Sequence, residues 1–202
     1  MTRLVMLAFF LTCALAAFAQ TSKGTISLGG LVSASTGTSK ALGVERESTS
    51  VTIAPGAGFF VADNMELGMN LFFGYGNDKA DGDDLTSSRS AGLEPYFKYY
   101  LFTNNERFAF TLNAAMTFGF TKRDNPPDSF YPDATGKNFG ISFSPGFSYF
   151  FTDKIGLDFE LQGIMFSYSD PNSDTDDDEG TYLTIGAASL NPSLGFKYYF
   201  AR

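Results

Sequence analysis

One segment of the chain has residue types and a spacing that suit a metal ion. Oxygen-bearing side chains recur at alternate positions, namely Asp170, Asn172, Asp174 and Asp176. Carboxylate and amide oxygens at this spacing are the ligands of calcium-binding loops. The EF-hand pattern also requires glycine where Thr175 stands and glutamate where Thr181 stands. Two interpretations therefore stay open: a specific calcium site, and a solvated acidic loop that gathers divalent cations loosely.

A second set of chemically active side chains is charged and lies inside segments of alternating residue type. Its members fall in the phase that otherwise holds small or polar residues: Glu66, Glu94, Lys98, Arg107, Asp158, Glu160 and Lys197. If these segments are strands around a narrow space, the acids there face the bases. An unpaired buried charge costs several kcal/mol, so these groups should pair. We predict a salt-bridged plug, with a gated path for protons or ions as the alternative.

The composition argues against enzymes that depend on histidine. The chain has no histidine, so it cannot run a Ser-His-Asp relay or use an imidazole base. The only cysteine, Cys13, lies in the apolar N-terminal segment. Nothing in the spacing points to a catalytic carboxylate pair. We therefore predict no enzyme and no cofactor, and the formal charge of -8 argues against nucleic acid as a partner.

The elements that must position the charged side chains are strands. The clearest is 107–121, where the even positions are apolar and the odd ones small or polar: Phe108, Phe110, Leu112, Ala114, Met116, Phe118 and Phe120 are the even set. This period of two indicates a strand with two different faces. The strand is longer than the ~9–11 residues that a tilted strand needs to cross a bilayer.

Similar segments occur along the whole chain. We predict further strands at 25–35, 51–61, 65–76, 139–151 and 155–168, one that ends at Leu101, and one that ends at Phe200. The alternation slips at Gly163, where a bulge would restore it. Four of the strands carry a proline, Pro55, Pro95, Pro145 and Pro192, which marks a repeated hairpin. Proline cannot donate to a strand ladder, so each should give a kink or a missing bond.

The connections alternate between long and short. The long ones are 36–50, 77–89, 122–137 and 170–180. Outer-membrane barrels are built in this way, with long external loops and short periplasmic turns. We predict an all-β fold: an eight-stranded antiparallel up-and-down transmembrane β-barrel, a meander, with a polar plugged lumen. It would lie in the outer membrane of a Gram-negative bacterium, and its even number of strands would leave both termini periplasmic.

The apolar face could instead be the core of a soluble barrel or sandwich. Against this, the other face carries mostly Gly, Ser, Ala, Thr and Asn, whereas a soluble surface is rich in Lys and Glu. Eight strands leave an interior that small side chains can fill. Aromatic residues also end the apolar faces at both rims, as expected at lipid interfaces.

The N-terminus has the pattern of a secretory signal. Arg3 precedes the apolar run 4–15, and Ala17-Phe18-Ala19 is a small-x-small cleavage site. We predict that residues 1–19 are a cleaved signal peptide and that residues 20–202 form the barrel domain.

Together, the cleavage site, the Pro-x-Phe-x-Tyr tracts and the terminal Gly195-Phe196-Lys197-Tyr198-Tyr199-Phe200 resemble the small outer-membrane proteins of the OmpA transmembrane-domain and OmpX type. The resemblance implies that the barrel-assembly machinery reads a terminal aromatic residue. Here Phe200 is followed by Ala201 and Arg202, which departs from that pattern.

Three functions are open at this stage. The first is a monomeric barrel with a structural or interaction role through its external loops, in contact with outer-membrane lipid and lipopolysaccharide. The second is a narrow porin-like channel for small solutes or ions. The third is a binder of an apolar ligand, favoured if Gly163 and the prolines open the wall.

Overall fold

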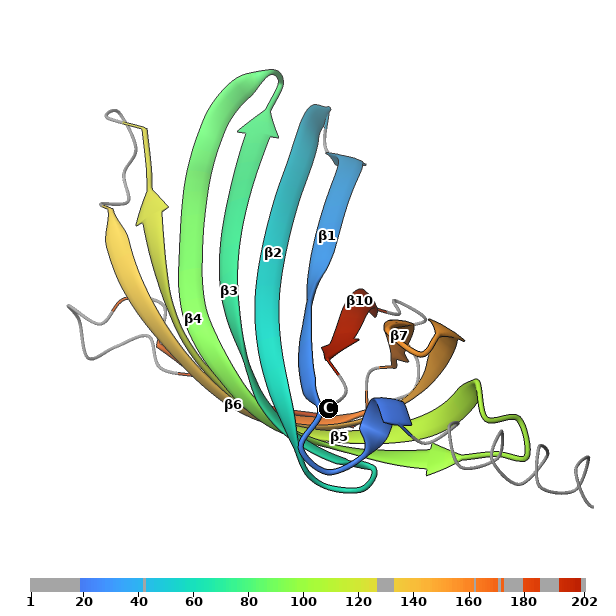
Figure 1. Ribbon diagram of the computed structural model, residues 1–202. Helices are drawn as coiled ribbons and strands as arrows, with labels where there is room; N and C mark the ends of the chain where they lie inside the picture. The colour runs from blue at the N-terminus through green and yellow to red at the C-terminus, as the bar shows by residue number, and fades with distance from the viewer. Residues whose placement is uncertain are drawn as a thin grey trace, which may run out of the picture.

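The computed structural model describes residues 19–41, 43–126, 133–161, 163–170, 172, 180–185 and 193–200. A short 3₁₀ helix, η1, is followed by strands only (Figure 1). The elements are η1 (Ala19–Thr21), β1 (Ile26–Ala41), β2 (Val44–Ala62), β3 (Met65–Ala80), β4 (Asp83–Phe102), β5 (Phe108–Asp124), β6 (Ala134–Thr152), β7 (Ile155–Glu160), β8 (Ile164–Asp170), β9 (Gly180–Ile185) and β10 (Ser193–Phe200). Among the described residues no helix is long and apolar enough to cross a membrane.

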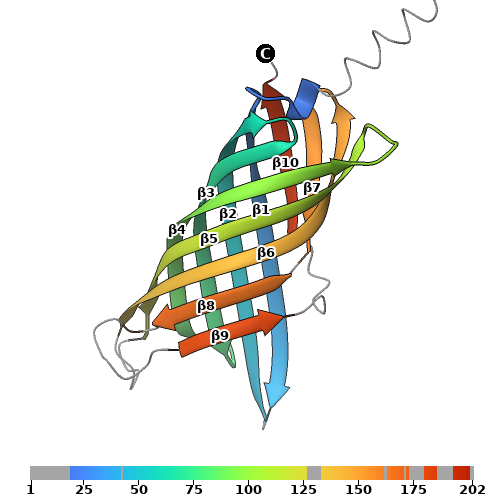
Figure 2. The same cartoon turned by 90° about the horizontal axis from the view of Figure 1, so that it is seen from below.

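The strands form a closed antiparallel ring. The order is β1, β2, β3, β4, β5, β6, β7 and β10, and β10 pairs with β1. β8 pairs with β6 beyond the end of β7, and β9 pairs with β8 as an extra strand outside the ring (Figure 2). The predicted eight-stranded up-and-down barrel is therefore confirmed. Its seventh strand is divided into β7 and β8, and β9 and β10 both belong to the predicted eighth strand.

The division of the seventh strand lies where the alternation slips. β6 pairs Gly146 with Glu160 and Phe143 with Ile164, so one more residue intervenes on the β7–β8 side than on β6. A Cβ atom on Gly163 would lie 2.0 Å from the carbonyl oxygen of Phe143. Only glycine allows this close approach of two backbones. The irregularity is the predicted one-residue bulge.

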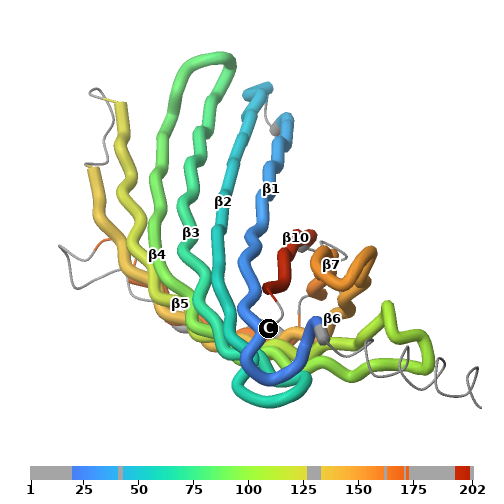
Figure 3. Tube along the Cα trace, in the orientation of Figure 1, coloured from blue at the N-terminus to red at the C-terminus, as the bar shows by residue number. Residues whose placement is uncertain are grey.

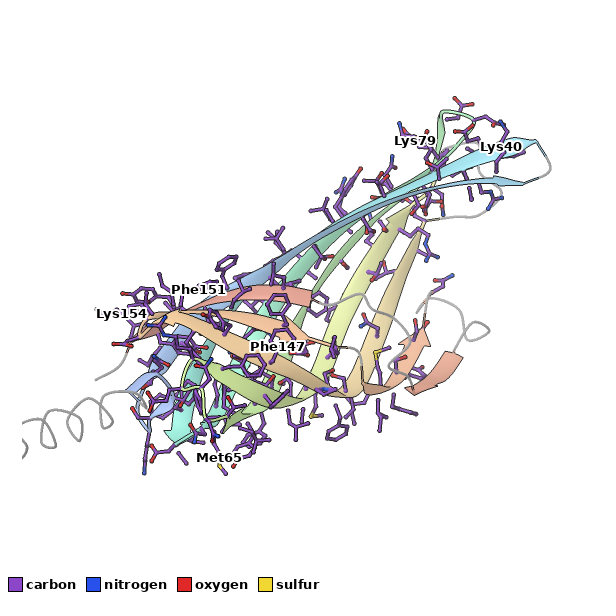
Figure 4. All side chains as sticks on the ribbon, turned by 90° about the vertical axis from the view of Figure 1, so that its right-hand side faces the viewer. Lys40, Met65, Lys79, Phe147, Phe151 and Lys154 are labelled. Atoms are coloured by element: carbon purple, nitrogen blue, oxygen red, sulfur yellow. The ribbon has the colours of Figure 1, made fainter. Side chains whose placement is uncertain are left out.

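The barrel has two distinct ends. Figure 4 places Met65, Phe151 and Lys154 at one end, which we call the turn end, and Lys40 and Lys79 at the other, which we call the loop end. Apolar side chains point outward between these ends, as predicted. Phe110 and Phe143 are 54% and 57% exposed, whereas the inward-facing Asn113 is 7% exposed.

Two of the predicted long loops are instead continuations of the strands. β1 and β2 stay paired up to Ala41 and Val44, and β3 and β4 up to Ala80 and Asp83. Both hairpins rise well above β7 and β10 (Figure 3). Asp81 and Gly82 have φ values of 50° and 90°, which is the geometry of a two-residue hairpin turn. The alternation fades in these segments because both faces of each hairpin meet water.

The prolines interrupt the ladder on one side only. Pro55 and Pro95 are paired with the preceding strand, opposite Gly30 and Met69. On the side of the following strand, the residues that lie between Ile53 and Gly56, and those between Leu93 and Tyr96, have no paired partner. Pro145 behaves in the same way. Each of these three prolines therefore lies at an interruption of the pairing with the following strand, although Leu161 N still donates to the Pro145 carbonyl at 2.9 Å. Pro192 lies outside the described residues.

Candidate functional site in the lumen

The turn end of the lumen is filled by four aromatic side chains, which we call the aromatic floor. They are Phe60, Tyr100, Phe150 and Tyr199, each at most 1% exposed. Each comes from a different strand that runs towards the turn end. Their ring centroids lie 5.4–6.5 Å apart in the contacting pairs. These distances are typical of packed aromatic rings, so the floor is a small hydrophobic core inside the barrel.

The floor was not predicted, although the sequence contains a signal for it. Each floor residue has an aromatic neighbour in the chain, which gives the doublets Phe59-Phe60, Tyr99-Tyr100, Phe150-Phe151 and Tyr198-Tyr199. Successive side chains of a strand point to opposite faces. Phe59 and Phe151 are 47% and 49% exposed on the outer face. One ring of each doublet thus faces outward and the other joins the floor.

The chain around η1 covers the floor from the turn end. Thr21 Oγ1 donates to Asn64 Oδ1 at 2.7 Å, and Asn64 N donates back to the Thr21 carbonyl at 2.8 Å. Gln20 Nε2 donates to Asp153 Oδ1 at 3.2 Å. Gln20 and Thr21 are both buried. These contacts tie the segment to the β2–β3 and β6–β7 turns.

Above the floor lies a layer of buried charges, which we call the ionic layer: Glu66, Lys98, Asp158 and Lys197. Lys197 Nζ is 2.8 Å from both carboxylate oxygens of Glu66, whose side chain is fully buried. Lys98 Nζ lies 3.1 Å from Asp158 Oδ2, and Lys197 Nζ lies 3.5 Å from the same atom. Ser27 and Tyr96 also donate to Glu66. The layer is thus paired and hydrogen-bonded, as buried charges must be.

The other predicted members of the charged set lie elsewhere. Glu160 is at the edge of the layer, 3.5 Å from Lys98 Nζ. Within the described part of the chain, Glu94 accepts only from neutral groups: Asn70 Nδ2 at 3.0 Å and Thr117 Oγ1 at 3.1 Å. Arg107 is exposed in the turn before β5. This corrects its placement in the lumen: Arg107 is in phase with the inward residues of β5, but the strand begins at Phe108 and Arg107 lies in the turn before it.

A cavity of about 430 Å³ lies on the loop side of the ionic layer. Its wall includes Asn70, Phe72, Glu94, Asn113, Thr117 and Glu160. Phe72 was not predicted to lie in the lumen. Its inward ring lies over two glycines, since Cβ atoms on Gly92 and Gly119 would be 2.2 Å and 2.9 Å from its Cζ. The run Leu71-Phe72-Phe73, which breaks the alternation, was the available signal.

The proposed calcium ligands are only partly within the described residues. Asp170 ends β8, and its Oδ1 accepts from Asn172 N at 3.1 Å. Asp174 and Asp176 lie outside the described residues. Within the described part of the chain, no three acidic side chains are grouped so that they could hold a metal ion. The calcium interpretation stays a prediction.

Comparison with solved structures returns other barrels at low identity. Neisserial surface protein A is 17% identical, with 87% of this chain and 96% of that chain covered and a TM-score of 0.42. The N-terminal β-barrel domain of Pseudomonas aeruginosa OprF is 14% identical, with 88% and 98% covered and a TM-score of 0.37. OprG from Pseudomonas aeruginosa is 15% identical, with 92% and 100% covered and a TM-score of 0.45.

None of the curated proteins matches the chain. Residues 5–189 match the family described as outer membrane protein beta-barrel domain. The match extends over most of the chain and agrees with the closed antiparallel ring and its apolar outer face. It implies a Gram-negative outer membrane as the location. The chain belongs to the outer membrane protein beta-barrel domain family.

Proposed function

We propose that this protein is a closed, non-enzymatic barrel that does its work at the loop end, which faces the outside of the cell. In this proposal the short turns and both chain ends face the periplasm. The barrel gives no through-path for solutes, and the cavity is reached from the outside. Lipid and lipopolysaccharide surround the loop end, where a partner can meet the exposed hairpins.

The observation that supports closure is the double seal at the turn end. The aromatic floor contains rings that are at most 1% exposed, and the ionic layer above it holds Glu66 with 0% exposure. Water or an ion would have to displace packed rings and then break hydrogen-bonded ion pairs. Both steps are costly in a low-dielectric interior.

The hairpins at the loop end carry charges suited to a wet surface. Lys40 and Glu45 lie 3.6 Å apart, and Lys79 and Asp84 lie 3.4 Å apart. The hydrogen bond from Asn77 and the Lys79 ammonium hold the pKa of the Asp84 carboxyl below its usual value. Exposed pairs of this kind add little stability. They leave the hairpins polar and available for contact.

Planar-bilayer recording tests the closed barrel. The unaltered protein should give no steady conductance above the bare bilayer, because the floor and the ionic layer block the lumen. A double variant, Tyr100→Ala with Phe150→Ala, should show openings, since it removes two rings of the floor. The matched control is Tyr99→Ala with Phe151→Ala, which removes the outward ring of the same doublets and should stay silent.

Two results would count against this function. A large steady conductance of the unaltered protein would make the barrel a channel. Silence of the Tyr100→Ala, Phe150→Ala variant, with its folded state shown by the fast-migrating band on an unboiled gel, would show that the aromatic floor is not the seal.

A second function, binding of an apolar ligand through the wall, is favoured by the seam between β1 and β10. Their pairing ends at Leu31 and Gly195, and beyond this point no described residue pairs with β1 on that side. The cavity reaches this place, since Leu31 and Phe196 line it. Phe196 is also 59% exposed on the outer face. The cavity thus reaches the part of the wall where the described pairing of β1 with β10 ends.

Mass spectrometry of the barrel released from mild detergent tests this second function. An apolar molecule, such as a lipid or fatty acid, should remain bound to the unaltered protein. Leu31→Ser should lose it, because the change removes an apolar wall of the cavity. Leu28→Ser, on the outward face of the same strand, should keep it. A protein that carries no bound molecule would exclude this function.

A further inference from the structure

The cavity wall carries more carboxylate groups than the neighbouring ammonium groups can neutralise. Among the described residues, the lumen holds the carboxylates of Glu66, Glu94, Asp158 and Glu160, but only two ammonium groups, those of Lys98 and Lys197. Lys197 serves Glu66 and Asp158, and Lys98 serves Asp158 and Glu160. Because Arg107 lies outside the lumen, the described part of the chain supplies no third base to balance the set.

Glu94 is the carboxylate left without a cation. Among the described residues, its oxygens receive one amide donor and one hydroxyl donor and no ammonium or guanidinium group within ion-pair distance. An ionised carboxylate can accept about four hydrogen bonds. Glu94 therefore keeps acceptor capacity, and it lines the cavity.

A second observation, on an amide side chain, points to a missing donor in the same cavity. Asn113 Nδ2 donates to both carboxylate oxygens of Glu160, at 3.0 Å and 3.2 Å. Its Oδ1 atom is buried and has no hydrogen-bond partner among the described residues, and the residue is 7% exposed. A buried acceptor without a donor is costly, so Asn113 calls for a donor that the described residues do not supply.

The size and the remaining wall of the cavity suit an organic molecule. About 430 Å³ corresponds to on the order of a dozen water molecules of about 30 Å³ each, so a bare inorganic ion would leave it largely water-filled. Leu31 and Phe72 add an apolar side to the wall. Ligand sites commonly combine an apolar lining with a few polar groups that fix orientation.

We propose that the cavity binds a small organic cation with a primary ammonium group and a short apolar chain. The ammonium has three N–H donors, and the wall offers acceptors on Glu94, Glu160 and Asn113. The apolar chain packs against Phe72 and Leu31. The inference goes beyond closure of the barrel, because the ligand enters from the loop side and does not cross the aromatic floor.

This site is tested by titration of the full chain, in uncharged detergent micelles, with n-butylammonium chloride. Ligand-observed NMR monitors the binding. The unaltered protein should bind n-butylammonium at least about tenfold more tightly than 1-butanol, butyrate or tetramethylammonium. Glu94→Gln should weaken binding about tenfold or more, since it removes the unmatched charge and keeps the side-chain shape. Glu106→Gln, the same change in an exposed turn, should leave affinity unaltered.

Equal binding of n-butylammonium to the unaltered and Glu94→Gln proteins would overturn the proposal. So would equal binding of 1-butanol, or no binding at all. If tetramethylammonium binds as tightly as n-butylammonium, recognition by N–H donors is excluded. The fast-migrating band on an unboiled gel confirms that Glu94→Gln is folded. Failure of the ligand-binding proposal is distinguishable from failure of the closed-barrel proposal, because conductance measures closure and titration measures binding.

Discussion

Replacing Lys197 with methionine is expected to lower the free energy of unfolding by about 3–5 kcal/mol, because it leaves a fully buried carboxylate without its cation. Lys197 Nζ lies 2.8 Å from both oxygens of Glu66, and the Glu66 side chain has no exposed surface. Methionine fills a similar volume, so the decrease in the free energy of unfolding reports the missing charge and not a new cavity. Ser27 and Tyr96 still donate to Glu66 but supply no positive charge.

Urea unfolding in phospholipid vesicles, read from the folded band on unboiled gels, measures this loss. The double variant Lys197→Met with Glu66→Gln should recover most of the lost stability, because a neutral amide replaces the unpaired charge. Arg107→Met is the matched control and should change stability by less than about 0.5 kcal/mol, since Arg107 is exposed in a turn. A similar loss for both single variants would contradict the ionic layer described above.

Replacing Phe150 with alanine is expected to destabilise the barrel by about 3–5 kcal/mol, the usual cost of removing a buried phenyl ring. Phe150 is fully buried and contacts Tyr100, Phe102 and Tyr199. These rings belong to β4 and β10 of a closed barrel, so they cannot collapse far into the space that Phe150 leaves.

Phe151→Ala provides the comparison, in the same doublet and with the same change of residue. This ring is 49% exposed on the outer face, so its loss should cost no more than about 2 kcal/mol, from transfer of the ring alone. The same urea titration measures both variants. Equal losses at 150 and 151 would show that the aromatic floor is not a packed core.

The alternation of residue types was enough to predict the strands, the outward apolar face and the barrel, because a period of two depends only on local geometry. Strand ends are less well determined. Arg107 continues the pattern of β5 but lies in the turn, and the segments around Gly43 and Asp81 lack an apolar face but continue the strands. The dipeptide Asp81-Gly82 is a typical hairpin signal, and it marks the tight turn between β3 and β4.

The contacts of the site were harder to predict, because they cross the lumen. Glu66 stands opposite Lys98 in the β3–β4 ladder, yet its ion pair is with Lys197 on β10. Lys98 on β4 instead contacts Asp158 on β7. Such pairs depend on the curvature and tilt of the whole ring, which no single strand encodes. The cavity depends on the same long-range arrangement.

The missing pairs beside the prolines recur at one level of the wall. Pro55, Pro95 and Pro145 each stand five residues before the floor aromatic of their strand, so the interrupted positions lie at one distance from the sealed base. Pairing resumes on both sides of this level. The interruptions therefore form a single belt around part of the barrel, between a paired base and paired hairpins.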